Sequence, residues 1–115
     1  MPMGLDTVRG MLIGARKAVK EIRLLLQENK IEEARETAAR KILCLVDMYK
    51  EGELEKYRNT PDNLKSAPNS ERMLENAERM EAVLGLFRNE NDDWRPCEEW
   101  NLDAVDQLLE EIINS

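Results

Sequence analysis

The stretch LDTVRGMLIGARKAVKEIRLLLQE, residues 5–28, places apolar side chains along one side of a helix. They recur at intervals of three and four residues: Leu5, Val8, Leu12, Ala15, Val19, Ile22 and Leu26. That period matches the roughly 3.6 residues of a helical turn, whereas a half-buried strand alternates at every second residue. The stretch therefore predicts a long amphipathic helix over about residues 4–28.

Three further segments, over about 31–57, 70–88 and 101–114, show the same helical period. A long loop (58–69) and a connector that holds both tryptophans (89–100) separate them. Since 115 residues suit one small domain, we expect a single α-helical domain over residues 1–115. The predicted fold is all-α, a small bundle of about four helices in two helical hairpins, which homodimerisation could complete. The apolar stripes of the three later helices are Ile31, Ala34, Ala38, Ile42, Leu45 and Tyr49; Met73, Ala77, Met80, Leu84 and Phe87; and Leu102, Val105, Leu109 and Ile112.

Several polar residues and glycines predict where the helices begin and end. Asn29 is suited to end the first helix, and with Glu32 it also forms an N-cap arrangement for the second. The segment NKIEEARETAARKI, residues 29–42, resembles the loop and second helix of a tetratricopeptide-type hairpin. The other expected boundary residues are Gly52, which would weaken or end the second helix, Asn69 or Ser70 as the cap of the third, and Asn101 before the fourth.

Histidine is absent, which removes imidazole bases, Ser/His and Cys/His couples and imidazole zinc ligands. The two cysteines form no CxxC pair and are too few for a four-thiolate zinc site. We expect Cys44, within the apolar run ILCLV, to be buried, and Cys97, beside Pro96, to be more exposed. No cofactor and no metal site is expected.

Charge is unevenly distributed along the chain, whose net charge is −7. Residues 1–50 hold ten Lys/Arg against seven Asp/Glu, whereas residues 51–115 hold seven against seventeen. Residues 90–111 contain nine acidic residues and one basic residue, Arg95, so this region should project a negative potential. Such residues could simply solvate a helix face, or they could form a docking surface for a basic partner.

The connector NENDDWRPCEEW, residues 89–100, combines Trp94 and Trp100 with acidic side chains. A structural role, in which the rings cover one end of the core, is one interpretation. The other is an interface anchor, because tryptophan is enriched among binding hot spots and would here lie inside an acidic rim. The candidate partner-binding residues are Asp92, Asp93, Trp94, Glu98, Glu99 and Trp100.

Basic residues of the first helix, Arg9, Arg16, Lys20 and Arg23, lie at helical spacings and could follow a phosphate backbone. The overall negative charge and the absence of aromatic residues among them argue against nucleic acid. We expect this basic stripe to pair mainly with acidic helices inside the bundle or across a dimer.

An enzymatic alternative rests on two carboxylate pairs, Glu78-x-x-Glu81 and Glu90-x-x-Asp93. They resemble the ExxE and ExxD pairs of the all-α nucleoside triphosphate pyrophosphohydrolases, which hold Mg²⁺ and substrate phosphates. The second pair falls in the predicted connector rather than on a facing helix, so the four carboxylates are not expected to converge.

These patterns favour a non-enzymatic protein–protein interaction module, such as an adaptor, chaperone-like protein or inhibitor, with a basic protein surface as its partner. A nucleic-acid-binding subunit that uses the first helix is the alternative, and a magnesium-dependent pyrophosphohydrolase is the second. The N-terminus MPMGLDTV lacks the basic and apolar regions of a signal peptide, and no segment has the roughly 18 apolar residues of a membrane span. We therefore expect a cytoplasmic protein that does not bind membranes.

Overall fold

The computed structural model describes residues 5–115, with side chains from Gly10 onward. Helices make up most of this range, and no strand forms within it, so the predicted all-α fold is confirmed. In chain order the elements are α1 (Leu5–Gln27), α2 (Ile31–Ala38), the π-helical turn η1 (Ala39–Leu43), α3 (Cys44–Arg58), the 3₁₀ turn η2 (Asp62–Leu64), α4 (Pro68–Phe87), the 3₁₀ turn η3 (Cys97–Glu99) and α5 (Leu102–Ile113).

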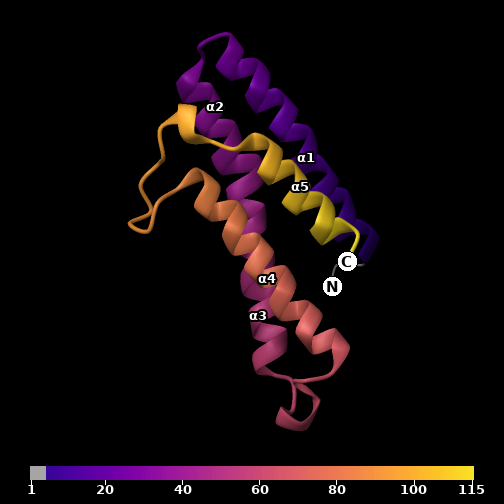
Figure 1. Ribbon diagram of the computed structural model, residues 1–115. Coiled ribbons are helices and arrows are strands. Elements are labelled where there is room, and N and C mark those ends of the chain that lie inside the picture. Colours follow the sequence, from indigo (N-terminus) through magenta and orange to yellow (C-terminus); the bar gives the residue numbers. More distant parts are fainter. Residues whose placement is uncertain (1–4) are drawn as a thin grey trace.

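The helices form an elongated bundle with extents of 52 × 30 × 23 Å. In Figure 1, α2, η1 and α3 form one long rod. α1 packs along its upper part, α4 packs along α3, and α5 lies against α1 and α4. The end of α3 and the start of α4 project beyond the other helices, and the loop that joins them lies at the tip (Figure 1). α1 and α5 lie side by side although they come from opposite ends of the chain.

The end of α1 is set by Asn29, as predicted. Asn29 has a positive φ of 60°, a left-handed conformation that asparagine tolerates better than most residues. The Lys30 amide donates to the Leu25 carbonyl at 2.8 Å and the Asn29 amide to the Leu26 carbonyl at 3.0 Å, the two bonds of a Schellman motif. The predicted N-cap role of Asn29 is wrong, because Lys30 takes the cap position of α2 and makes no side-chain cap bond.

The second predicted helix is a continuous rod that contains the π-helical turn η1. A π turn holds more residues than an α turn, so side chains four apart remain on one side. The buried face accordingly steps through Ala34, Ala38, Ile42 and Val46. The predicted stripe continued to Leu45 and Tyr49; both side chains are half-buried and pack against the core, while Val46 takes the fully buried position.

The same burial pattern explains why the prediction for Cys44 is wrong. Leu43 and Val46 take the buried positions, and the Cys44 side chain lies exposed on another side of the rod. A helix cannot bury all five residues of ILCLV on one face. The Cys97 side chain is half-buried and packs against the core. Gly52 does not end the helix either, since α3 continues to Arg58.

α4 begins earlier than the predicted cap residues. Ala67 is the N-cap and Pro68 occupies the first turn, where a missing amide hydrogen costs nothing, so Asn69 and Ser70 already lie inside the helix. The buried Ser70 hydroxyl instead donates to the Leu64 carbonyl at 2.8 Å and ties the loop to the helix. Asn101 caps α5 as expected, because its side chain accepts a hydrogen bond from the Ala104 amide at 3.0 Å.

One apolar core joins all the long helices. Phe87 of α4 and Ile22 of α1 are its largest fully enclosed side chains, together with Leu12, Ile42 and Leu109. Leu108 and Ile113 of α5 also pack against this core as half-buried side chains.

Candidate protein-binding site

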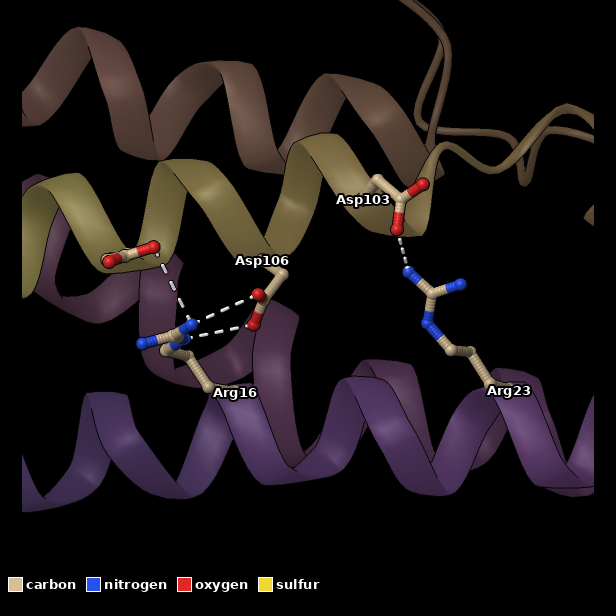
Figure 2. Close-up of polar contacts among 5 residues, drawn as sticks. Arg16, Arg23, Asp103 and Asp106 are labelled. Atoms are coloured by element: carbon tan, nitrogen blue, oxygen red, sulfur yellow. Dashed lines mark hydrogen bonds and ion pairs between the residues drawn. The ribbon is translucent and has the colours of Figure 1, made fainter.

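The acidic residues of α5 are neutralised by arginines of neighbouring helices. Figure 2 shows Arg16 and Arg23 of α1 reaching Asp106 and Asp103 of α5. Arg16 also lies 3.7 Å from Glu110. The order of these pairs shows that α1 and α5 run antiparallel. On the other side of α5, Arg79 of α4 lies 3.6 Å from Glu111.

The pair between Arg16 and Asp106 is bidentate. Nε and Nη2 of the guanidinium donate to the two carboxylate oxygens at 2.9 and 3.0 Å (Figure 2). The hydrogen bonds from Arg16, more than its charge, lower the pKa of Asp106, and the same bonds raise the pKa of Arg16. Both side chains remain about one-third exposed, so this pair orients α5 on α1 but adds only modest stability.

Internal pairing of the basic stripe is thus confirmed for Arg16 and Arg23. Lys20 is exposed and forms no ion pair with any side chain in the described range, although its charge also helps to lower the pKa of Asp106. The side chain of Arg9 lies outside the described residues. The two arginines that could have contacted a phosphate backbone are therefore engaged within the fold.

The connector between α4 and α5 starts with a tight, hydrogen-bonded turn. The Asn89 side-chain oxygen accepts hydrogen bonds from the amides of Asn91 and Asp93 at 2.9 and 3.1 Å. The Asn89 amide donates to the Asp93 carbonyl at 2.9 Å, and Asp92 adopts a positive φ of 60°. Asparagine at the start of a turn is well suited to this role. The turn therefore fixes the backbone that carries Asp92 and Asp93.

Arg95 fastens the connector to the end of α4. Its amide donates to the Phe87 carbonyl at 2.8 Å, and its side-chain Nε donates to the Gly85 carbonyl at 2.7 Å. Carbonyls in the last turn of a helix lack hydrogen-bond donors within the helix, and Arg95 supplies two such donors to α4. The basic residue that seemed isolated within the acidic stretch is a helix cap.

The two tryptophans form an aromatic cluster with Phe87. The Trp100 ring packs edge-on against Phe87, with the ring centroids 5.0 Å apart. It lies tilted against the Trp94 ring, with a centroid distance of 5.6 Å. Trp100 is only 7% exposed, and its indole N–H donates to the Arg95 carbonyl at 2.9 Å. Trp100 therefore covers the end of the core and does not present its ring to a partner, whereas Trp94 is half-buried beneath the Arg88 guanidinium at 4.8 Å.

The four expected partner-binding carboxylates differ from those of α5. Asp92, Asp93, Glu98 and Glu99 are all exposed, and none forms an ion pair with a side chain that the structure describes. We call these four residues the acidic connector surface. The long acidic stretch of the sequence is thus divided into a neutralised helix and an unneutralised connector.

The carboxylates of the enzymatic alternative do not form a ligand cluster. Among the described side chains, residues 10–115, no group of three or more His, Cys, Asp or Glu could hold a metal ion. Glu81 instead accepts a hydrogen bond from Lys50 of α3 at 2.8 Å. This bond raises the pKa of Lys50 and outweighs burial, which lowers it.

Sequence reasoning missed an open groove beside the connector. It has a volume of about 550 Å³ and lies between η1 and the start of α3 on one side and the end of α4 on the other. Asn89 and Asp92 of the connector line one end. Its lining includes the small residues Ala39, Cys44 and Gly85, which come together only when α3 packs along α4, so no local signal in the sequence indicated it.

No family model, curated protein or solved structure matches the chain. Within the described residues, no helix combines the length and apolarity required to cross a membrane.

Proposed function

We propose that this protein is a non-enzymatic interaction module that binds a basic protein surface through its acidic connector surface. The observation that carries this proposal is the contrast between two sets of carboxylates. Those of α5 are neutralised by Arg16, Arg23 and Arg79, while those of the connector are exposed and unpaired within the described chain. Other exposed acids without an ion pair in the described range, such as Glu33, Glu55 and Glu71, are spread over α2, α3 and α4, whereas the four of the connector lie within residues 92–99.

The connector also has the rigidity that a binding surface needs. Asp92 and Asp93 lie on a hydrogen-bonded turn, and the Trp94–Trp100 pair holds that turn against the core. A preorganised surface loses less entropy when it binds than a mobile loop does. Clustered carboxylates also speed association with a basic partner by long-range attraction, an effect that weakens with salt.

The same geometry gives less support to nucleic acid as a partner. Arg16 and Arg23 already contact carboxylates, so a phosphate would have to compete with those ion pairs. The cysteines, both free thiols, fit a reducing compartment and support the cytoplasmic location that we propose.

The test compares two quadruple variants that change net charge equally. The first replaces the acidic connector surface: Asp92→Asn, Asp93→Asn, Glu98→Gln and Glu99→Gln. The matched control replaces exposed acids of other elements that form no ion pair within the described range: Glu33→Gln, Glu55→Gln, Glu71→Gln and Glu78→Gln. Asparagine tolerates the left-handed backbone of position 92, so the turn should persist.

Each tagged protein is used to capture partners from lysate of the native host, with and without nuclease treatment, and captured proteins are identified by mass spectrometry. We expect a protein partner that the wild type and the control retain and the connector variant loses, with retention falling as salt rises. A partner retained equally by both variants would contradict the proposal, as would capture that depends on nucleic acid.

A further inference from the structure

The groove beside the connector is lined in part by small residues. Ala39 of η1, Cys44 of α3 and Gly85 of α4 line it, and all three are small. A Cβ placed on Gly85 would meet no atom within 4 Å other than the local backbone of α4, so there is room for a larger side chain at this position. Its volume of about 550 Å³ lies within the usual range for ligand sites, roughly 300 to 1,000 Å³.

The groove is lined by more acidic than basic side chains. Lys50 is enclosed by carboxylates, at 2.8 Å from Glu81, 3.6 Å from Asp47 and 3.8 Å from Glu51. The other base, Arg88, lies over the Trp94 ring. Arg88 forms no ion pair among the described side chains and keeps its charge, but the lining still holds three carboxylates, Asp47, Glu81 and Asp92, against these two cations.

The groove is also continuous with the acidic connector surface, because Asp92 belongs to both. A chain segment bound along the connector would reach the groove at Asp92. Within it, Asp47 is a second exposed carboxylate, on α3. A basic side chain that entered from the connector would therefore meet carboxylates at the end and along the wall of the groove.

We infer that the groove binds an arginine- or lysine-rich segment of the partner protein. Asp92 and Asp47 would be its counter-ions, and the segment would pass over Gly85. This inference rests on the proposed function and adds the form of the partner: a narrow basic segment that inserts, rather than a flat basic surface that only touches the connector. Open space at Gly85 is what such a segment requires, since its backbone or stem must approach α4 closely.

The test fills the groove without changing its charge. Gly85→Leu introduces a side chain into the open space, and Gly14→Leu does the same on an exposed part of α1 as the matched control. Binding of a fluorescein-labelled oligo-arginine peptide is followed by anisotropy, with oligo-glutamate of equal length for comparison. Circular dichroism and thermal melting check that each variant is folded. We expect Gly85→Leu to weaken oligo-arginine binding by about tenfold or more, and Gly14→Leu to leave it unchanged.

A second measurement needs no change to the groove itself. Cys44 lines the groove and is exposed, so bound oligo-arginine should slow its alkylation by a maleimide in a Cys97→Ser background. Protection of Cys44 together with the Gly85→Leu effect would support the inference. Absence of oligo-arginine binding, equal binding of oligo-glutamate, or unprotected Cys44 with unaffected Gly85→Leu would overturn it.

The two proposals can fail separately. If the connector variant loses its captured partner while Gly85→Leu retains it, the interaction function stands and the groove is not the site of insertion. If both retain that partner equally, the proposed function fails as well.

Discussion

Arg16 of α1 and Asp106 of α5, 90 residues apart in sequence, share two parallel hydrogen bonds that fix how the two ends of the chain pack. Two planar groups held at two points resist rotation, which a single contact does not. Two further ion pairs lie along the same interface. Arg16 is 3.7 Å from Glu110, and Arg23 contacts Asp103. α5 is thereby held in register against α1, and the connector that precedes it is held with it.

Asp106→Asn should lower the melting temperature, because it removes the charge that Arg16 contacts. Both side chains are about one-third exposed, so we expect a loss of about 1 kcal/mol or less, corresponding to a decrease of about 3 to 6 °C at most in a chain of this size. Asp92→Asn is the matched control, since Asp92 is exposed and unpaired in the described chain. Equal melting of the two variants, measured by circular dichroism, would show that the pair contributes nothing.

The stability difference between the wild type and Asp106→Asn should depend on pH. The hydrogen bonds from Arg16 hold the folded-state pKa of Asp106 below its usual value, and burial opposes them. The stabilising contribution is therefore fully present above the unfolded-state pKa of about 3.9 and is lost as the pH falls through the lower folded value. Urea unfolding at a series of acidic pH values measures this convergence. A difference that grows in acid would contradict it.

Trp100→Ala should destabilise the protein far more than Trp94→Ala. Trp100 contacts Phe87 at the end of the core and is 7% exposed, so its removal leaves a cavity, at a cost of about 3 to 5 kcal/mol in the free energy of unfolding. Trp94 is half-buried and its ring faces Arg88, so its loss should cost about 1 to 2 kcal/mol. Chemical denaturation of both variants gives the comparison. Equal losses would mean that the two rings act as one unit.

Gly52→Ala should stabilise α3. Gly52 lies in the interior of a helix, has no positive φ, and leaves open space where a Cβ would stand. Alanine restricts the unfolded chain and improves helix propensity, so we expect a gain of about 0.5 to 1 kcal/mol in the free energy of unfolding. Thermal and urea unfolding both report the gain, and a loss would indicate a contact of Gly52 that the bundle requires.

The helices could be predicted from the sequence because the period of their apolar residues is a local property. The stripes of residues 5–28 and 101–114 predicted Leu12, Ile22 and Leu109 as core positions, and all three are buried. The positions after the π turn could not be predicted, since η1 shifts the register of the following helix and its presence depends on packing between helices. That shift reversed the prediction for Cys44.

The candidate site was predictable in composition but not in arrangement. Asp92 and Glu98 were identified from charge alone, but charge alone does not distinguish them from Asp103 and Asp106. Only the antiparallel packing of α1 on α5 separates the paired carboxylates from the unpaired ones. The groove required a further step, because Cys44 and Gly85 are 41 positions apart and become neighbours of one cavity only when α3 lies along α4.

The two thiols should differ in reactivity, and in the order opposite to the one that their sequence contexts suggest. Cys44 is exposed in the groove, whereas burial, ahead of nearby charges, raises the pKa of the half-buried Cys97. A raised pKa leaves less thiolate, and burial restricts access, so Cys97 should react slowly with a maleimide in the native protein. Cys44 should react first, which mass spectrometry of partly alkylated, digested protein can measure. In denaturant the two rates should converge, since both differences come from the fold. If Cys97 reacted first in the native protein, the register assigned to α3 after the π turn would be wrong.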